Sequence, residues 1–116
     1  MQIADQRRER VLAPAERRGH PRLDTRWWGD LVIGARHLEC YVYNVSVGGA
    51  KLLVFGRVEP MRQALLFVPP FGVFRCDVRW AAYPFAGIEF AQSERRRSAG
   101  LVTHALGQIE NRFAAG

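Results

Sequence analysis

The sequence contains almost no lysine, since 16 of its 17 basic residues are arginine and Lys51 is the only lysine. It has only two cysteines, and its apolar runs fall far short of the roughly 18 to 20 residues that a membrane-spanning helix needs. The first 22 residues carry arginines and no apolar core of the kind that a secretory signal contains. The sequence therefore predicts a cytoplasmic protein with no membrane span.

The two cysteines and three histidines form no recognisable catalytic or metal-binding pattern. Cys40 and Cys76 are 36 positions apart, with no CxxC and no ligand-type neighbours at metal-binding spacing. Lone cysteines usually behave as small hydrophobic residues, so both are expected to be free, buried thiols. No nucleophile, histidine and acid follow one another in a catalytic order. We therefore expect neither an enzyme nor a metal or cofactor.

Length and composition predict one folded domain. The 116 residues leave little room for a second domain, and the 48% hydrophobic and 11% aromatic content excludes wholesale disorder. The net charge of +6 suggests an anionic partner. The arginine excess has two interpretations: a general codon bias, or a site that needs planar guanidinium groups able to grip phosphate or guanine in pairs.

The chain divides into a charged N-terminal part, a β-rich middle and a C-terminal helix. Residues 1–14 are expected to be a mobile segment, and residues 15–116 a single domain with an N-terminal arm over 15–25, a barrel over 26–90 and a helix over 93–113. Short runs of β-branched and aromatic residues, separated by Gly and Pro, predict six strands. These are Arg26–Ile33, His37–Val45, Ala50–Phe55, Ala64–Val68, Val73–Ala82 and Phe85–Phe90. Six short strands at this spacing suggest a small antiparallel barrel or sandwich. The predicted fold is an all-β, six-stranded barrel with the helix packed against it.

Within the second predicted strand, strict alternation places Cys40 and Val42 on one face and Tyr41, Tyr43 and Val45 on the other, so both faces are expected to be partly covered.

The C-terminal helix shows an apolar stripe at a spacing close to 3.6 residues. Ser93 is its expected N-cap. Three consecutive arginines, Arg95 to Arg97, follow at the start of the helix, where cations oppose the helix dipole. A solvated basic face is the favoured interpretation of this run, and an interaction site is the alternative.

Two short patterns carry the functional argument. Arg18 and Arg22 form an RxxxR in the arm, but a chain with 16 arginines should contain about two such pairs by chance. Asn44, Ser46 and Gly49 form an NxSxxG at the end of the second predicted strand, and this composition should produce a [D/N]xSxxG only about 0.014 times. The alternative for the second pattern is a plain turn, in which Asn44 and Ser46 bond to nearby backbone and Gly49 supplies a positive φ.

Together, RxxxR before the first strand and [D/N]xSxxG at the end of the second resemble the PilZ domain, a bacterial receptor module for cyclic di-GMP. The resemblance covers about residues 15–113, and Arg79-Trp80 and the run Gly87–Phe90 are similar to the way the family ends its barrel. It implies a stand-alone cyclic di-GMP receptor that orders its arm around the ligand and signals to an unidentified downstream protein. The implied setting is motility, biofilm or exopolysaccharide control.

The resemblance also implies roles for individual residues. Arg18 and Arg22 would clasp phosphate and guanine, because arginine pairs bidentately with both and also stacks on purine faces. Asn44 would address a guanine edge, Ser46 would hydrogen-bond to base or phosphate, and Gly49 would allow close approach of the backbone. Arg17, directly before the motif, is the feature that favours two stacked ligand molecules over one. Asn stands at position 44 where the family most often has Asp, which bears on affinity. Trp80 is expected in the core rather than stacked on a base.

Two alternative functions remain. A small basic barrel could bind nucleic acid, but the sequence shows no evident series of exposed aromatic residues at alternate strand positions, which a stacking platform needs. A protein with the same fold could also act as an adaptor that no longer binds nucleotide, against which both complete motifs argue.

Overall fold

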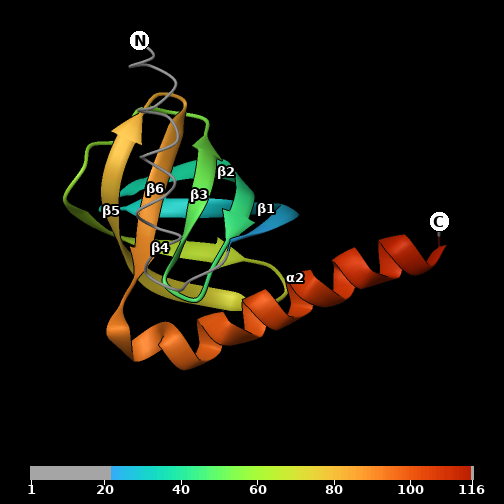
Figure 1. Cartoon of the computed structure of the whole chain (residues 1–116). Coiled ribbons are helices and arrows are strands. Elements are labelled where there is room, and N and C mark those ends of the chain that lie inside the picture. Colours follow the sequence, from blue (N-terminus) through green and yellow to red (C-terminus); the bar gives the residue numbers. More distant parts are fainter. Residues whose placement is uncertain (1–21, 116) are drawn as a thin grey trace, which may run out of the picture.

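The protein is a closed barrel with a C-terminal helix (Figure 1). The computed structural model describes residues 22–115, and side chains as far as Gln108. The strands are β1 (Leu23–Ile33), β2 (Arg36–Val45), β3 (Gly49–Val54), β4 (Arg62–Val68), β5 (Gly72–Ala82) and β6 (Phe85–Phe90), followed by the 3-10 turn η1 (Gln92–Glu94) and α2 (Arg95–Ala115). Their order around the barrel is β1-β2-β3-β6-β5-β4, and every pair is antiparallel. The predicted six-stranded barrel with a C-terminal helix is confirmed.

The barrel core follows from the alternation of side chains along each strand. In β4 every second residue from Ala64 to Val68 is buried while its neighbours are exposed, as expected for a strand with one face inside. The largest fully buried side chains come from all six strands and from α2. Cys40 and Cys76 are both buried and free, as predicted, and burial raises the pKa of each thiol to about 12.

Bulges near one end of β1 and β2 change which side chains face inward. The register shifts between Asp24 and Trp27 in β1 and between Val42 and Asn44 in β2. Because a bulge inserts one extra residue, Val45 joins the buried face and Tyr43 stays outside. The prediction that Val45 shares a face with Tyr43 is therefore wrong. The hydroxyl of Thr25 donates to the carbonyl oxygen of Val42 at 2.6 Å and so pairs a buried acceptor beside the bulge.

The first strand begins three residues earlier than predicted. Residues 23–25, expected in the N-terminal arm, belong to β1, because Leu23 pairs with Val45 and Thr25 is buried. The β-ladder therefore extends to within one residue of Arg22, the second arginine of RxxxR.

The helix α2 packs against the barrel through its first half and runs beyond it toward the C-terminus (Figure 1). Leu101 and Ala105 are buried, and the indole N–H of Trp27 donates to Gln108 Oε1 at 3.2 Å. No helix in the described part of the chain is long and apolar enough to span a membrane. Ser93, the predicted N-cap, lies inside η1 instead, so the α-helix begins two residues later.

The arginines at the start of α2 are held by contacts within the chain. Arg97 donates to the Val73 carbonyl at 2.9 Å and to Glu94 at 2.6 Å, and its guanidinium lies 4.4 Å from the ring centroid of Phe74. Arg95 is also bonded, as described below. Arg95 and Arg97 therefore fasten the helix to the barrel while their side chains stay partly exposed, so this basic face is both solvated and bonded.

Glu94 makes the stability of this attachment dependent on pH. Its carboxylate accepts the Arg75 backbone N–H at 3.0 Å, and this bond, together with Arg97, holds the pKa of Glu94 below its usual range against the opposing effect of burial. A carboxyl group whose pKa is lower in the folded state stabilises the fold at pH values above its unfolded-state pKa of about 4.3. This stabilisation is lost as the pH falls through the folded-state pKa.

The Glu94→Gln variant tests this contribution. We expect it to lower the free energy of unfolding at pH 7, and the difference from wild type to shrink below about pH 4. Urea denaturation between pH 3 and 7 measures both quantities. Glu59→Gln, at an exposed carboxylate, is the matched control and should change little throughout. A difference for Glu94→Gln that stays constant with pH would contradict the assignment.

Candidate functional site

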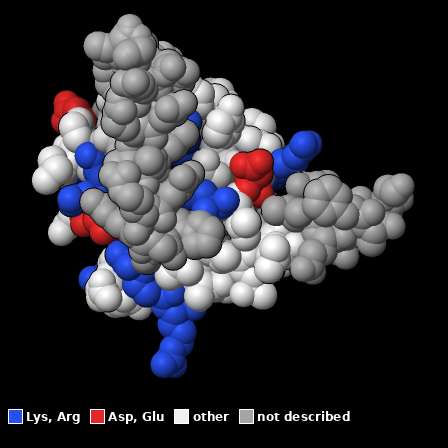
Figure 2. Space-filling view, viewed as in Figure 1, with Lys and Arg blue, Asp and Glu red and all other residues white. Residues whose placement is uncertain are grey.

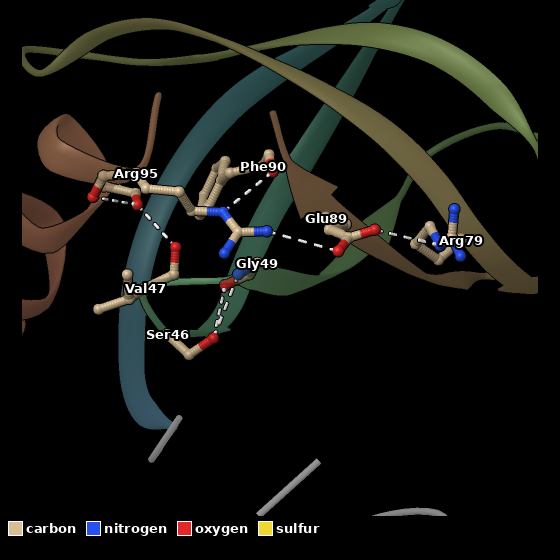
Figure 3. Close-up of polar contacts among 8 residues, drawn as sticks. Ser46, Val47, Gly49, Arg79, Glu89, Phe90 and Arg95 are labelled. Carbon is tan, nitrogen blue, oxygen red and sulfur yellow. Dashed lines mark hydrogen bonds and ion pairs between the residues drawn. The ribbon is translucent and has the colours of Figure 1, made fainter. Parts of the chain in front are cut away.

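The NxSxxG residues form the connection between β2 and β3. Ser46 is 2% exposed, and its hydroxyl accepts the Gly49 backbone N–H at 3.2 Å. The backbone N–H of Ser46 donates in turn to the Gly49 carbonyl at 2.8 Å. The motif therefore closes its own loop (Figure 3), as the plain-turn alternative expects of Ser46.

Gly49 is required by the packing of β3 on β6. A Cβ at this position would lie 2.1 Å from the carbonyl oxygen of Ile88, closer than real Cβ contacts. The positive φ that a plain turn predicted for Gly49 is wrong, because the positive-φ glycines of the described chain are Gly34, Gly56 and Gly72. The backbone that closely approaches Gly49 is therefore that of Ile88 in β6, a strand of the same barrel.

Arg22 and Asn44 bring the two motifs together. The Arg22 guanidinium donates to Asn44 Oδ1 at 3.0 Å, across 22 positions of sequence. The ladder explains the contact, since Asp24 is paired with Asn44 and Arg22 directly precedes β1. Desolvation lowers the pKa of Arg22, but a guanidinium remains charged at neutral pH. Arg17 and Arg18, the other arginines of the predicted site, lie outside the described residues.

Hydrogen bonds connect the motif loop to β6 and to the start of α2, and Figure 3 shows the bond from Val47 to the start of α2. The Ser98 hydroxyl donates to the Val47 carbonyl at 2.7 Å, and the Phe90 N–H donates to the Gly48 carbonyl at 2.8 Å. Arg95 donates to the Phe90 carbonyl at 3.2 Å. A ligand that moves this loop would therefore act directly on the N-terminal turns of the helix.

Glu89 lies between two of the arginines around the loop (Figure 3). Its carboxylate oxygens are 3.3 Å from Arg79 and 3.4 Å from Arg95, and all three side chains are partly exposed. Neither this cluster nor the Ser98 bond was predicted from the sequence. The three-arginine run was the only signal for it, and strand pairing had to be known before Glu89 could be placed beside Gly49.

Trp80 is exposed rather than in the core. It is 41% accessible, and its indole lies against Gly87, where a Cβ would come within 2.1 Å of the ring nitrogen. The register shift between Val78 and Trp80 turns the tryptophan to the outside. The predicted core position is therefore wrong.

A cluster of exposed and half-buried aromatic rings lies on the outside of β1 and β2, together with the residue after β3 and the first residue of β6. We call it the aromatic face and define it by Trp28, Tyr41, Tyr43, Phe55 and Phe85, whose neighbouring ring centroids lie 5.1 to 6.4 Å apart. Tyr41 and Tyr43 occupy alternate positions of one strand. Tyr41 is half-buried and Tyr43 is exposed, so the rings cluster across neighbouring strands rather than along one strand.

The described part of the site is open rather than enclosed. A groove of about 340 Å³ runs along β4 and β5, and it contains none of the motif residues. Lys and Arg side chains lie at several places on the visible part of the surface, with smaller separate patches of Asp and Glu (Figure 2). No group of three His, Cys, Asp or Glu side chains that could hold a metal occurs in the described range 22–115. What the described site offers is a polar loop edge with one guanidinium and one amide at its rim.

The architecture defines a class: a closed six-stranded antiparallel barrel followed by a helix. No family model and no curated protein matches the sequence. Among solved structures, the chain is similar to the PilZ domain of CeSA from a cellulose-synthesizing bacterium, with 9% identity, a TM-score of 0.61, and coverage of 77% of this chain and 98% of that one. It is also similar to the PilZ domain of YcgR from Escherichia coli with c-di-GMP, with 14% identity, a TM-score of 0.64, and coverage of 82% and 95%.

A third structure, YcgR from Escherichia coli in complex with c-di-GMP, matches with 15% identity and a TM-score of 0.62 over 83% of this chain. The chain spans about half of that protein, with 49% covered. The particular fold is therefore PilZ-like, and the predicted resemblance is confirmed at the level of the fold.

Proposed function

We propose that this chain is a receptor for cyclic di-GMP. The observation that carries the proposal is the Arg22–Asn44 hydrogen bond, which brings an arginine of RxxxR onto the first residue of NxSxxG in a PilZ-like fold. Two of the similar structures contain c-di-GMP. The strand pairing that brings the two motifs together places their polar groups at one rim of the barrel, where a single ligand would contact both.

The chemistry of the ligand suits the residues at the site. Cyclic di-GMP offers two phosphates and two guanines, and guanidinium groups pair bidentately with phosphate or with guanine O6 and N7. Arg22 and Arg18 would grip these groups, and Arg17 would favour a second ligand molecule. Because Arg22 takes Asn44 Oδ1, the Asn44 amide N–H groups are left to address a guanine edge.

Ser46 and Gly49 would act by shaping the loop. The Ser46 hydroxyl bonds to Gly49, so a direct bond to base or phosphate would require it to leave that partner. The closed loop instead holds Asn44 in position at its rim. The N-terminal arm would order over the bound ligand, because folding a charged segment on binding supplies contacts that the barrel edge lacks.

The signal would pass by contact with a downstream protein, with no catalysis and no cofactor. The motif loop bonds directly to Ser98 and, through Phe90, to Arg95, and these bonds would be the route from the ligand to α2. A cytoplasmic receptor of this kind would serve motility, biofilm or exopolysaccharide control.

A thermal-shift screen over cyclic dinucleotides tests the proposal. A ligand that binds only the folded chain stabilises it by RT ln(1 + [L]/Kd), about 2.7 kcal/mol at 100 Kd. We expect a clear rise in Tm with cyclic di-GMP and a smaller rise with cyclic di-AMP, since its adenines lack the guanine O6 acceptor. A flat screen would favour the adaptor that does not bind nucleotide.

Single-stranded nucleic acid is a second candidate ligand, favoured by the aromatic face, on which bases could stack. Asp30 and Glu39 lie on the same outer surface and would repel phosphates. Fluorescence titration with a labelled oligonucleotide tests this candidate. Binding that falls steeply with salt would support it, and no binding at low salt would exclude it.

A further inference from the structure

The aromatic face is exposed and has no part in the proposed ligand site. Trp28 is 56%, Phe55 52% and Tyr43 42% accessible. The Trp28 and Phe55 rings are nearly parallel, with 17° between their planes and 6.0 Å between their centroids. Contiguous exposed aromatic side chains mark interaction sites more often than isolated ones do, and Trp and Tyr are enriched at binding hot spots. A partner that covers this face must also match the charges at its two ends.

The end of the face away from the motif loop is acidic. Asp30 and Glu39 are directly opposite one another on β1 and β2, two residues along from the Trp28 and Tyr41 pair and on the same outer side. The Glu39 carbonyl accepts the Phe55 backbone N–H at 2.9 Å, so the acidic pair adjoins the aromatic rings. Like charges opposite one another in a ladder destabilise it, so this end attracts a cation.

The end of the face near the motif loop is basic. Arg26 is exposed two residues before Trp28, and alternation along β1 puts it on the same outer side. The Lys51 ammonium lies 5.3 Å from the ring centroid of Tyr43 and 5.0 Å from that of Phe85. Among the described side chains, neither the two basic groups nor the two acidic groups of this face form an ion pair. All four charges are therefore available to a partner.

We propose that a second copy of this chain covers the aromatic face, in a two-fold symmetric dimer that places the acidic end of each copy on the basic end of the other. A two-fold interface brings one surface against itself, so that surface must be self-complementary. An axis that runs across the strands at the level of Trp28 and Tyr41 meets this requirement. It reverses the direction of the strands and sets β1 against β1 and β2 against β2.

The spacing along β1 fits this axis. Asp30 and Arg26 are each two residues from Trp28, or about 7 Å along the strand in opposite directions. Asp30 of one copy therefore lies over Arg26 of the other, and the two Trp28 rings meet beside the axis. Sheets pack face to face about 10 Å apart, a gap that an arginine and a carboxylate span together.

The spacing along β2 follows the same rule. Glu39 is two residues from Tyr41 on the acidic side, and Tyr43 is two residues from it on the basic side, where Lys51 lies beside the Tyr43 ring. Glu39 of one copy therefore comes over Tyr43 and Lys51 of the other. The lysine then pairs with a carboxylate while it keeps its contact with the ring.

The charge balance favours a second copy over other partners. The two basic and two acidic side chains of the face cancel, so the net charge of +6 is carried elsewhere on the chain. A polyanion such as nucleic acid meets repulsion at the acidic end, and a basic protein meets it at the basic end. A second copy of the chain complements both ends at once.

The size of the face predicts a reversible dimer. A standard interface buries roughly 800 Å² per partner, and the three most exposed rings of this face offer on the order of 300 Å². The other two rings and the charged side chains supply further area. We therefore expect monomer and dimer to exchange with concentration.

The test is sedimentation velocity of the full chain over a range of concentrations, without nucleotide. The variants Asp30→Arg and Arg26→Asp each place like charges against one another, and each should remain monomeric at concentrations where the wild type forms dimers. An equimolar mixture of the two variants should form dimers again, because both like-charge contacts become opposite-charge contacts in the mixed dimer. The recovery also shows that both variants are folded.

Two controls separate the face from general effects. Arg96→Asp changes the net charge as much as Arg26→Asp does, at an exposed position of α2, and should leave dimer formation unchanged. Trp28→Ala should weaken the dimer about 30-fold or more, the effect of losing an interface hot spot. Met61→Ala removes a side chain that is 72% exposed outside the face and should have little effect.

A wild type that stays monomeric up to about 1 mM would overturn the proposal. Dimers that persist in Asp30→Arg and in Arg26→Asp, or a mixture of the two that stays monomeric, would overturn it as well. A monomeric wild type that binds a single-stranded oligonucleotide, and loses this binding in Trp28→Ala, would assign the face to nucleic acid instead. Because no cyclic dinucleotide is present, the result does not depend on the proposed function.

Discussion

Replacing Arg22 with alanine is expected to weaken cyclic di-GMP binding by roughly 10- to 150-fold. The range corresponds to the 1.5 to 3 kcal/mol that a charge-assisted hydrogen bond contributes. Arg22 would lose both its grip on the ligand and its bond to Asn44 Oδ1, which holds the amide in place. Titration calorimetry of wild type and variant measures the ratio of dissociation constants, and Arg18→Ala should show a loss of similar size.

The matched control for this prediction is Arg62→Ala. Arg62 is half exposed and pairs with Glu59, and it begins β4 near the β1–β2 turn, at the opposite end of the barrel from the motif loop. Its removal lowers the net charge as much as that of Arg22 does, so a general electrostatic effect would appear in both. Equal losses in Arg22→Ala and Arg62→Ala, or no loss in either, would contradict the site assignment.

Replacing Gly49 with alanine is expected to lower the free energy of unfolding by about 1 to 3 kcal/mol, the cost of overpacking a tight contact. The added Cβ would meet the Ile88 carbonyl, and backbone cannot rotate aside as a side chain can. Separating β3 from β6 also displaces the loop that positions Asn44, so cyclic di-GMP affinity should fall as well. Urea denaturation and calorimetry measure the two effects.

The variant Gly100→Ala separates a local clash from the general effect of the substitution. Nothing lies within 4 Å of a Cβ at this position of α2. In a helix this change reduces the entropy lost on folding, so stability should rise by about 0.5 to 1 kcal/mol. If Gly49→Ala were as stable as wild type, the requirement for glycine at the β3–β6 contact would be disproved.

The barrel could be predicted because glycine and proline residues mark the ends of the strands clearly. At least one glycine or proline separates each predicted strand from the next, and the ends of the observed strands differ from the predicted ones by at most three residues. The meeting of Arg22 with Asn44 also follows from antiparallel pairing of the first two strands, since the residues just outside one strand must face the far end of the next.

The composition of the outer surface could not be predicted because β-bulges determine which side chains face outward. Strict alternation assigns Val45 to the side of Tyr43, and one extra residue reverses that assignment. The same reasoning failed for Trp80, beside the bulge in β5. The aromatic face was missed for a related reason, since its rings come from β1, β2, β6 and the residue after β3, and only the closed barrel shows that these are neighbours.

The start of α2 shows a second limit of sequence reasoning. Arg95 and Arg97 appear unfavourable at a helix N-terminus, yet they bond to the carbonyls of Phe90 and Val73 and to nearby glutamates. Long-range partners of this kind are not encoded in local spacing. Their consequence is that the helix and the motif loop share one hydrogen-bonded network, through which a ligand signal would leave the site.

Calorimetric titration of cyclic di-GMP into the wild-type chain tests the central claim most directly. Saturable binding that Arg22→Ala weakens and Arg62→Ala does not is the predicted result, and Arg17 predicts two ligand molecules per chain. A stoichiometry of one would contradict only the role of Arg17. The absence of saturable binding by a folded wild-type chain would contradict the proposal that this PilZ-like barrel is a cyclic di-GMP receptor.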